Sequence, residues 1–273
     1  MKTLYVTDLD GTLLNNDGKL SEYSVNIINE LVKKGMYFTY ATSRSIQSAS
    51  NVTKGLIINL PVITRNGIFI ENTNNNEKIY SLKFSDEEKY LIMKILEKYS
   101  IYPLVCSFIN GEEKRSFIND KETDAIKIEL NSSKGETRYR FVNNAKDLYY
   151  GDLFYIRCIG EKKSLIDVYN DLIETNKFSC LLQKEYYSEH YWCEILPKNA
   201  TKGNTVLVLK ELLKCNKIIS FGDGLNDIEM FKVSDESYAV ENAEEELKEN
   251  ATGIIISNDN NGVAKWLVDN YGK

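Results

Sequence analysis

The sequence predicts an α/β protein with a Rossmann-like parallel-sheet core and an inserted α+β cap domain. Between residues 1 and 60, short apolar segments alternate with amphipathic helical segments, which is typical of a parallel sheet covered by helices. Strand and helix patterns of the same kind return after residue 195, whereas the stretch between has the pattern of an antiparallel sheet with its own helices. We therefore expect a discontinuous core at residues 1–81 and 195–273, with residues 82–194 forming a separate domain.

Apolar spacing and capping residues predict the elements of the first core segment. Residues 4–6 are apolar without a helical period and predict a short buried strand. Ser21 is suited to cap the following helix, and Gly35 to end it. Residues 36–41 predict the next strand and residues 45–54 a second helix.

The inserted block and the second core segment are predicted in the same way. Ser85 and Glu88 have the spacing of a capping box and predict a helix start, and a charged turn is expected at residues 111–115. Further strands are predicted at residues 101–109, 153–159, 178–182, 190–196 and 217–221, and further helices at 161–174, 204–214 and 228–232.

Composition excludes several classes of function. The net charge is −6, from 34 basic and 40 acidic residues, and the absence of a basic cluster argues against binding nucleic acid. The five cysteines are dispersed without a C-x-x-C pair, as in cytoplasmic proteins with reduced thiols. No signal peptide and no apolar stretch of membrane-spanning length is present, so we expect a cytoplasmic protein without a membrane partner. The single histidine, His190, excludes a multi-histidine metal site and leaves oxygen ligands, which suit Mg²⁺.

Two carboxylates follow the first predicted strand. Asp8 and Asp10 are separated by one residue, so in an extended chain both side chains leave the end of the strand on the same side. Such a pair is unfavourable unless a cation or a shared proton relieves the repulsion. Gly11 then permits a tight turn. A simpler interpretation is an Asp-Gly turn that closes a hairpin.

Polar residues also follow the second strand. Thr42 and Ser43 lie where this strand gives way to a helix, and a hydroxyl with free N–H groups at such a turn can bind phosphate oxygens. The alternative is that Thr42 only caps the helix. Further on, the Asn-Gly pair at residues 66–67 is interpreted as a type I′ hairpin turn.

The second core segment contributes a lysine and a further group of carboxylates. Lys202 begins a predicted helix, where the helix dipole disfavours a cation by about 0.3–1 kcal/mol, so an anion at the same place would explain it. The alternative is an ordinary surface lysine. After the strand at residues 217–221, Asp223 and Asp227 provide hard oxygen ligands and Asn226 a donor for phosphate. The alternative there is a turn with a helix cap.

These residues resemble the four motifs of the haloacid dehalogenase superfamily of phosphohydrolases, and the insert resembles the large α/β cap of its Cof-type branch. The matching stretches are D-L-D-G-T at residues 8–12, A-T-S-R at 41–44, Lys202, and G-D-G-L-N-D-I-E-M at 222–230. Ser43 stands where the Cof-type pattern has glycine.

The resemblance implies a role for each of these residues. Asp8 would be the nucleophile and Asp10 the general acid/base. Mg²⁺ would be bound by Asp8, the main-chain carbonyl of Asp10, and Asp223. The substrate phosphate would be held by residues from all four motifs, namely Leu9, Thr42, Ser43, Lys202 and Asn226. Asp227 would bind the metal through water or support the ligands from behind.

The implied function is Mg²⁺-dependent hydrolysis of a small phosphorylated metabolite, most simply a sugar phosphate, through an aspartyl-phosphate, with the cap selecting the substrate. Two alternatives stay open: a phosphotransferase or phosphomutase on the same scaffold, and a non-catalytic sensor of a phosphorylated ligand. A sensor would be expected to have lost Asp8 or Asp10, and both are present. We expect a monomer or weak homodimer.

Overall fold

The chain divides into two compact units. The computed structural model describes residues 2–119, 121, 126–127, 137–184 and 189–272. One unit comprises Met1–Ser81 and Ala200–Lys273, and the other Leu82–Asn199. The sequence predicts a return to the core at residue 195. The structure places it at Ala200, because the strand Tyr191–Pro197 still pairs within the sheet of the second unit.

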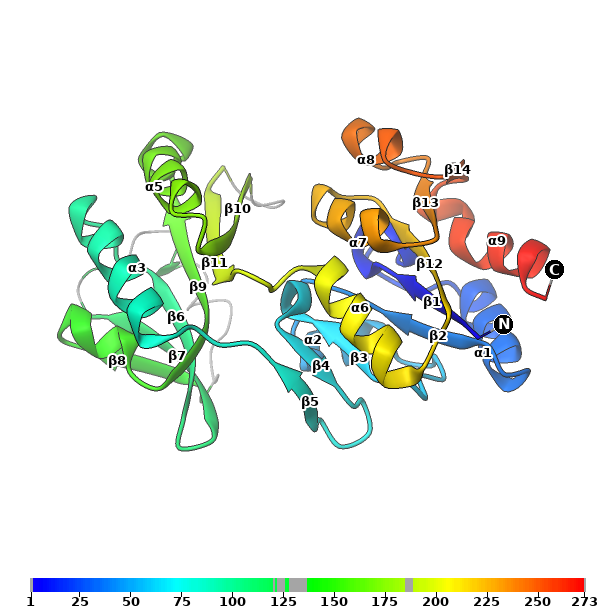
Figure 1. Cartoon of the computed structure of the whole chain (residues 1–273), viewed down its shortest axis with the longest axis horizontal. Coiled ribbons are helices and arrows are strands. Elements are labelled where there is room, and N and C mark those ends of the chain that lie inside the picture. Colours follow the sequence, from blue (N-terminus) through cyan, green and yellow to red (C-terminus); the bar gives the residue numbers. More distant parts are fainter. Residues whose placement is uncertain (1, 120, 122–125, 128–136, 185–188, 273) are drawn as a thin grey trace. The chain divides into compact units, whose positions relative to one another are not determined.

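A five-stranded parallel sheet forms the centre of the first unit (Figure 1). Its order is β14–β13–β12–β1–β2, and every neighbouring pair is parallel. The strands are β1 (Thr3–Thr7), β2 (Tyr37–Tyr40), β12 (Lys217–Gly222), β13 (Glu236–Val240) and β14 (Gly253–Ile255). The chain runs outward from β1 to β2 on one side and from β12 to β14 on the other. The boundary between β1 and β12 is therefore a topological switch point, where α/β proteins bind ligands.

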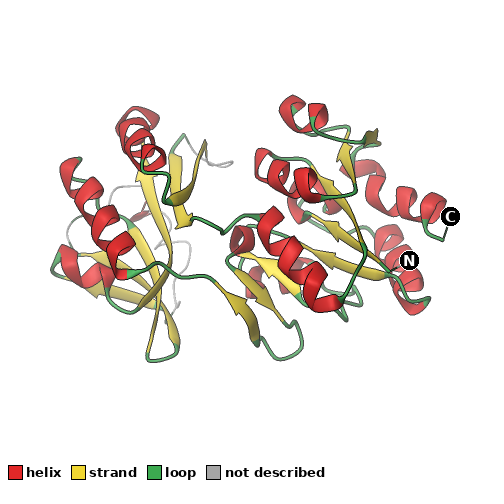
Figure 2. Cartoon of the chain, viewed as in Figure 1, coloured by secondary structure: helices red, strands yellow, loops and turns green. Residues whose placement is uncertain are grey.

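Helices cover both faces of this sheet (Figure 2). Alternate residues of β1 show the two layers, because side chains on a strand point to opposite faces. Tyr5 packs with α1 (Glu22–Lys33) and α9 (Gly262–Asn270), whereas Leu4 and Val6 pack with the other set of helices. That set comprises α6 (Lys202–Leu213), α7 (Ile228–Val233) and α8 (Glu245–Glu249). The remaining helix, α2 (Ile46–Val52), adds to the Tyr5 side.

A small antiparallel sheet flanks the parallel one. Its strands are β3 (Val62–Thr64), β4 (Phe69–Glu71) and β5 (Lys78–Ser81), and a parallel bridge from Ile63 to Ala41 links β3 to the end of β2. The Asn-Gly pair at residues 66–67 lies between β3 and β4, but the type I′ prediction is wrong. Four residues, 65–68, separate the paired ends Thr64 and Phe69, and three of them have positive φ. This longer loop brings the Asn66 side chain into the site described below.

The second unit is a six-stranded sheet with helices α3 (Asp86–Lys98) and α5 (Lys162–Glu174). The sheet order is β10–β11–β9–β6–β7–β8, and all pairs are antiparallel except β7 with β8. The strands are β6 (Leu104–Ile109), β7 (Glu112–Ile118), β8 (Tyr139–Val142), β9 (Asp152–Gly160), β10 (Phe178–Lys184) and β11 (Tyr191–Pro197).

The turn between β6 and β7 corrects a second prediction. Residues 112–115, expected in a charged turn, belong to β7. The turn is the two-residue pair Asn110 and Gly111, both with positive φ, and Ile109 faces Glu112 across it. This geometry is the type I′ turn that Asn-Gly favours. The charges of β7 are tolerated because Glu113 lies beside Arg115 and Arg138.

The predicted fold class is confirmed. A parallel α/β core is interrupted by a unit that contains both helices and a mainly antiparallel sheet. Within the described part of the chain, no helix is both long enough and apolar enough to cross a membrane.

Candidate active site

Asp8 lies at the carboxyl end of the central strand. Its main-chain N–H donates to the carbonyl of Phe221 in β12 at 2.9 Å, so the ladder between β1 and β12 continues to this residue. The following residues form a tight turn over Leu9–Leu13, in which Gly11 has φ +76°. The Leu9 side chain points into the core. Asp8 is therefore held by the sheet, and only 6% of its surface is exposed.

Lys202 joins two carboxylates inside the protein. Its Nζ donates to Asp8 Oδ1 at 2.6 Å and to Asp227 Oδ1 at 2.7 Å. The side chain is 1% exposed, which excludes the interpretation as a surface lysine. It begins α6, and Thr201 caps this helix by accepting from the N–H of Asn204. The anion inferred from the position of Lys202 is therefore present as protein carboxylates.

Close packing of α6 against α7 makes this contact possible. A Cβ on Gly203 would lie 2.1 Å from the main-chain oxygen of Glu229, so only glycine allows the two helices to approach this closely. The next residue N-terminal to Gly203 is Lys202, and α7 follows directly after Asp227. The glycine thus fixes the distance between the lysine and its carboxylate partner.

Both carboxylate oxygens of Asp227 accept hydrogen bonds. One oxygen accepts from Lys202, and the other accepts from the main-chain N–H groups of Asp223 and Gly224 at 3.1 Å each. The side chain is completely buried. These bonds hold the loop after β12 in one conformation. Asp227 is therefore better suited to support Lys202 and this loop than to bind a metal ion directly.

Asp223 approaches Asp8 from the other side of the switch point. Its Oδ1 accepts from the Thr12 hydroxyl at 2.7 Å. A Cβ on Gly11 would lie 2.2 Å from Asp223 Oδ2, so the turn after β1 can pack against this carboxylate only because residue 11 is glycine. Oxygen atoms of Asp8, Asp223 and Asp227 all lie within 4.8 Å of one another.

The electrostatics of this cluster are unfavourable without a further cation. Burial raises the pKa of Asp8 well above its usual range, and the neighbouring Asp227 and Asp223 raise it further, against the opposing effect of Lys202. Burial, followed by the charge of Asp227, raises the pKa of Asp223 to about 6. Burial alone would lower the pKa of Lys202, but Asp227 and Asp8 outweigh it and the net shift is upward, so the ammonium stays charged.

The donor set fits Mg²⁺. Hard carboxylate oxygens converge, and their repulsion is of the kind that a divalent cation relieves. Asp8 and Asp223 could hold the ion, whereas both oxygens of Asp227 already accept hydrogen bonds from Lys202 and two main-chain N–H groups. The carboxylate of Asp10 is not part of this cluster. This is compatible with the expected metal contact through its main-chain carbonyl.

Two of the predicted phosphate-binding residues, Thr42 and Asn226, are connected through a loop that the sequence does not assign to the site. Thr42 is fully buried, and its carbonyl accepts from the N–H of Asn66 at 3.0 Å. The side chain of Asn66 in turn accepts from Asn226 Nδ2 at 3.0 Å. Asn66 therefore connects the end of β2 to the loop after β12. Ser43, by contrast, is exposed, and no hydrogen bond in the described structure orients its hydroxyl.

The same loop also touches the start of α6. A Cβ on Gly67 would lie 2.3 Å from the carbonyl oxygen of Thr201, and the hydroxyl of Thr205 donates to the carbonyl of Gly67 at 2.7 Å. The sequence signal for this loop is the Asn-Gly pair itself, although such a pair predicts an ordinary hairpin turn. Positive φ at residues 65–67 allows the loop to fold inward.

Asp10 is held by an arginine that sequence reasoning had noted only as part of a motif. Arg44 Nε donates to Asp10 Oδ2 at 2.7 Å, and Arg44 Nη2 donates to Asp10 Oδ1 at 2.6 Å. Both side chains are partly exposed, in contrast to the buried Asp8–Lys202 pair. The two carboxylates at the end of β1 thus lie in different environments, and the extended geometry expected for them is replaced by the turn at Leu9–Leu13.

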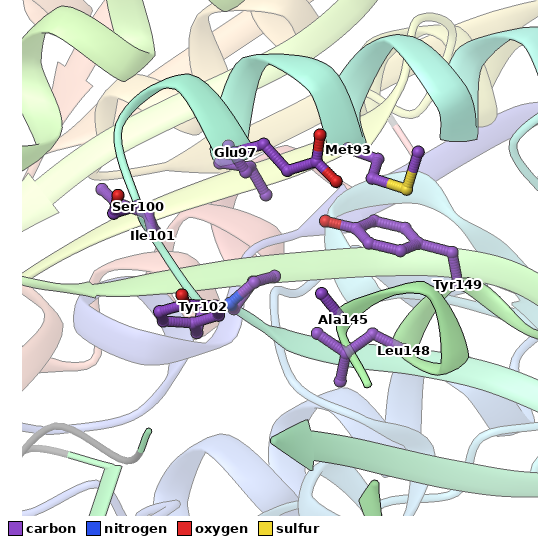
Figure 3. A pocket seen from close by; sticks show the side chains of 10 residues that line it. Met93, Glu97, Ser100, Ile101, Tyr102, Ala145, Leu148 and Tyr149 are labelled. Atoms are coloured by element: carbon purple, nitrogen blue, oxygen red, sulfur yellow. The ribbon is translucent and has the colours of Figure 1, made fainter. Parts of the chain in front are cut away.

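A cavity lies in the second unit, away from these motifs in sequence. It has a volume of about 270 Å³ and lies between the C-terminal end of α3 and the helical turn at Ala145–Tyr149 (Figure 3). Glu97 and the Tyr149 hydroxyl point toward one another across it. None of the predicted catalytic, phosphate-binding or metal-binding residues lines this cavity.

Comparisons with known proteins identify the family of the chain. The family model of haloacid dehalogenase-like hydrolases matches residues 5–267. A 5-amino-6-(5-phospho-D-ribitylamino)uracil phosphatase of Bacillus subtilis is 29% identical over 95% of each chain, and a second one is 24% identical over 98% of this chain and 97% of the relative. The X-ray structure of a Thermotoga maritima protein superposes with a TM-score of 0.78 at 26% identity, covering 100% of this chain and 99% of that one. The chain belongs to the haloacid dehalogenase-like hydrolases and is a phosphoric monoester hydrolase.

Proposed function

We propose that this chain hydrolyses a small phosphorylated metabolite with Mg²⁺, through an aspartyl-phosphate on Asp8. The observation that carries the proposal is the buried Asp8 carboxylate, held by Lys202 inside an oxygen cluster at the switch point of the sheet. A carboxylate fixed in this way can attack phosphorus without first being ordered, and phosphoryl transfer depends mainly on such positioning and on charge neutralisation.

The residues of the chain have separable tasks in this reaction. Asp8 attacks phosphorus, and the bond from phosphorus to the ester oxygen breaks. Asp10 gives its proton to the leaving oxygen and later takes a proton from the water that cleaves the aspartyl-phosphate. Bound at Asp8 and Asp223, Mg²⁺ would supply positive charge that offsets the repulsion between this carboxylate and the substrate phosphate.

Phosphate oxygens would be held by donors that the fold fixes around Asp8. An ammonium group has three donors, and in the described structure Lys202 uses two of them on Asp8 and Asp227. The remaining donor, the Thr42 hydroxyl, the Asn226 amide and the main-chain N–H groups near Leu9 and Ser43 are the proposed phosphate ligands. Asn66 would orient Asn226 for this purpose.

We propose a sugar phosphate or a phosphorylated polyol chain as the substrate. Support comes from the two Bacillus subtilis relatives, whose substrate carries its phosphate on a ribityl chain. Residues 82–199, which form a compact unit with its own core, would select the organic part.

The test measures phosphate release from p-nitrophenyl phosphate, glucose 6-phosphate and 5-amino-6-(5-phospho-D-ribitylamino)uracil, with Mg²⁺ and with EDTA. Asp8→Asn tests the nucleophile, and Asp17→Asn, a change at an exposed loop carboxylate, is the matched control. Activity that requires Mg²⁺, survives in the control and is lost in Asp8→Asn is expected. Phosphate transfer to added sugar instead of water would favour the phosphotransferase. Absence of both hydrolysis and transfer would contradict the proposal and favour a sensor.

A further inference from the structure

We infer that Arg44 is a positioning residue that orients the carboxylate of Asp10 for protonation of the leaving group. The inference rests on the proposed function, since it assigns Asp10 as the acid. The geometry that carries it is the two-point contact in which Nε and Nη2 of one guanidinium meet the two oxygens of one carboxylate. Parallel contacts of this kind fix the plane of the carboxylate as well as its distance.

Asp10 depends on this contact for its orientation. About 46% of its side chain is exposed, and in the described structure the only hydrogen bonds to its carboxylate come from Arg44. An exposed aspartate without such bonds samples several rotamers, whereas an acid must point at one oxygen of the substrate. The sheet orders the buried Asp8, but nothing comparable orders the side chain of Asp10.

Arg44 is itself held at three points. Its main-chain N–H donates to the Thr42 hydroxyl at 3.2 Å, its carbonyl accepts from the N–H of Arg65 at 3.0 Å, and its Nη1 donates to Ser48 Oγ at 2.9 Å. The guanidinium is therefore anchored to α2 through Ser48, and the main chain of Arg44 is fixed by Thr42 and Arg65. Truncating the side chain leaves both main-chain bonds in place, so the effect of Arg44→Met reports the guanidinium alone.

A comparison of leaving groups separates positioning of the acid from other roles. The p-nitrophenolate ion leaves without needing a proton, whereas the alkoxide of glucose 6-phosphate must be protonated as its bond to phosphorus breaks. We use kcat/KM, which covers the steps up to departure of the leaving group and omits the later attack of water. Loss of a positioned acid therefore lowers kcat/KM for the alkyl ester selectively.

The experiment measures kcat/KM on both esters for the wild type, Arg44→Met, Arg44→Lys, Asp10→Asn and the double variant. General acid catalysis contributes about 10²–10⁴-fold, so Arg44→Met is expected to lower the value for glucose 6-phosphate by about 10–100-fold. For p-nitrophenyl phosphate the loss should stay below about 3-fold, by the same reasoning. Once Asp10 is asparagine, adding Arg44→Met should have little further effect, because both changes remove the same step.

Two variants sharpen the result. Arg44→Lys keeps the charge but cannot make the two-point contact, so it is expected to show the same bias against the alkyl ester. Lys34→Met, which removes an exposed ion pair with Glu30, is the matched control and should leave both values unchanged.

Equal losses on the two esters in Arg44→Met would overturn the inference, because they would indicate contact with the phosphate or a general disturbance of the site. Full recovery by Arg44→Lys would overturn it as well, since charge alone would then suffice. These results require an active wild type. A wild type that releases phosphate from none of the three esters of the first test, and transfers none to added sugar, would refute the proposed function and the inference together.

Discussion

Replacing Asp223 by asparagine should stabilise the metal-free protein while it weakens Mg²⁺ binding. Burial and the neighbouring Asp227 raise the pKa of Asp223 to about 6 from an ordinary value near 3.8. The folded state therefore favours the protonated form. The stability that this group contributes is fully present below pH 4 and is lost as the pH rises through about 6.

The size of the effect follows from this shift. Moving the pKa from 3.8 to about 6 lowers the free energy of unfolding by about 3 kcal/mol at a pH where Asp223 is ionised in both the folded and the unfolded protein. At pH 4.5 the same shift lowers it by about 1 kcal/mol. Asparagine keeps an oxygen that can accept from Thr12 and carries no charge. In EDTA at pH 8 we expect Asp223→Asn to raise the free energy of unfolding by about 1–3 kcal/mol, with a smaller gain at pH 4.5.

Urea unfolding followed by tryptophan fluorescence measures the stability of the first structural unit, which contains Asp223. The chain has two tryptophans, and Trp266 packs against Phe221 and Tyr238 in the first unit. A Trp192→Phe background leaves Trp266 as the only reporter. Asp17→Asn, at an exposed loop position, serves as the control and should change little at either pH.

Added Mg²⁺ should offset most or all of this gain, because it should stabilise the wild type more than the variant. At about a hundred times its dissociation constant, a ligand that binds only the folded state stabilises it by about 2.7 kcal/mol. The wild type should gain about this much and Asp223→Asn much less. A variant that is less stable than the wild type in EDTA at pH 8, or equal stabilisation of both proteins by Mg²⁺, would refute this account of the cluster.

Three further outcomes are expected. Lys202→Met should destabilise the protein by about 3–5 kcal/mol at pH 8, because it leaves two buried carboxylates without their cation. Lowering the pH should recover part of the lost urea midpoint, because protonation removes the uncompensated charge. In Gly203→Ala the new Cβ would lie 2.1 Å from the main-chain oxygen of Glu229 and would force α6 away from α7. We expect this to lower the free energy of unfolding by about 1–3 kcal/mol. An unchanged urea midpoint would show that the two helices can separate freely. Burial raises the pKa of the Cys158 and Cys193 thiols, so iodoacetamide at pH 8 should label them, by mass spectrometry, only after urea is added.

The centre of the site could be predicted from the sequence because topology places it. Asp8 and Asp223 each follow a strand of the core, and parallel strands present their carboxyl ends at one edge of the sheet. Lys202 could be assigned to the group only with the family resemblance, because a helix start disfavours a cation by only about 0.3–1 kcal/mol and an ordinary surface lysine is equally compatible with the sequence. For the two aspartates, position along the chain is enough to bring them to one place.

Residues that act through side-chain partners across loops could not be found in the same way. The partner of Arg44 is 34 positions away, and no periodicity connects an exposed arginine to an exposed aspartate. The two Asn-Gly pairs show the same limit. The pair at residues 110–111 forms the tight hairpin that such pairs favour, whereas the pair at 66–67 forms a longer inward loop because Gly67 packs against Thr201 from another part of the chain.

The charge cluster explains why the site and the stability of the fold oppose each other. Asp8, Asp223 and Asp227 lie within 4.8 Å of one another, and one buried lysine does not neutralise three carboxylates. Substituting a neutral residue for Asp223 would relieve this repulsion, yet it would also remove the oxygen set that fits Mg²⁺. Asp8 and Asp223, which carry the proposed chemistry, therefore also destabilise the metal-free fold when they are ionised, and binding of the cation should couple catalysis to stability.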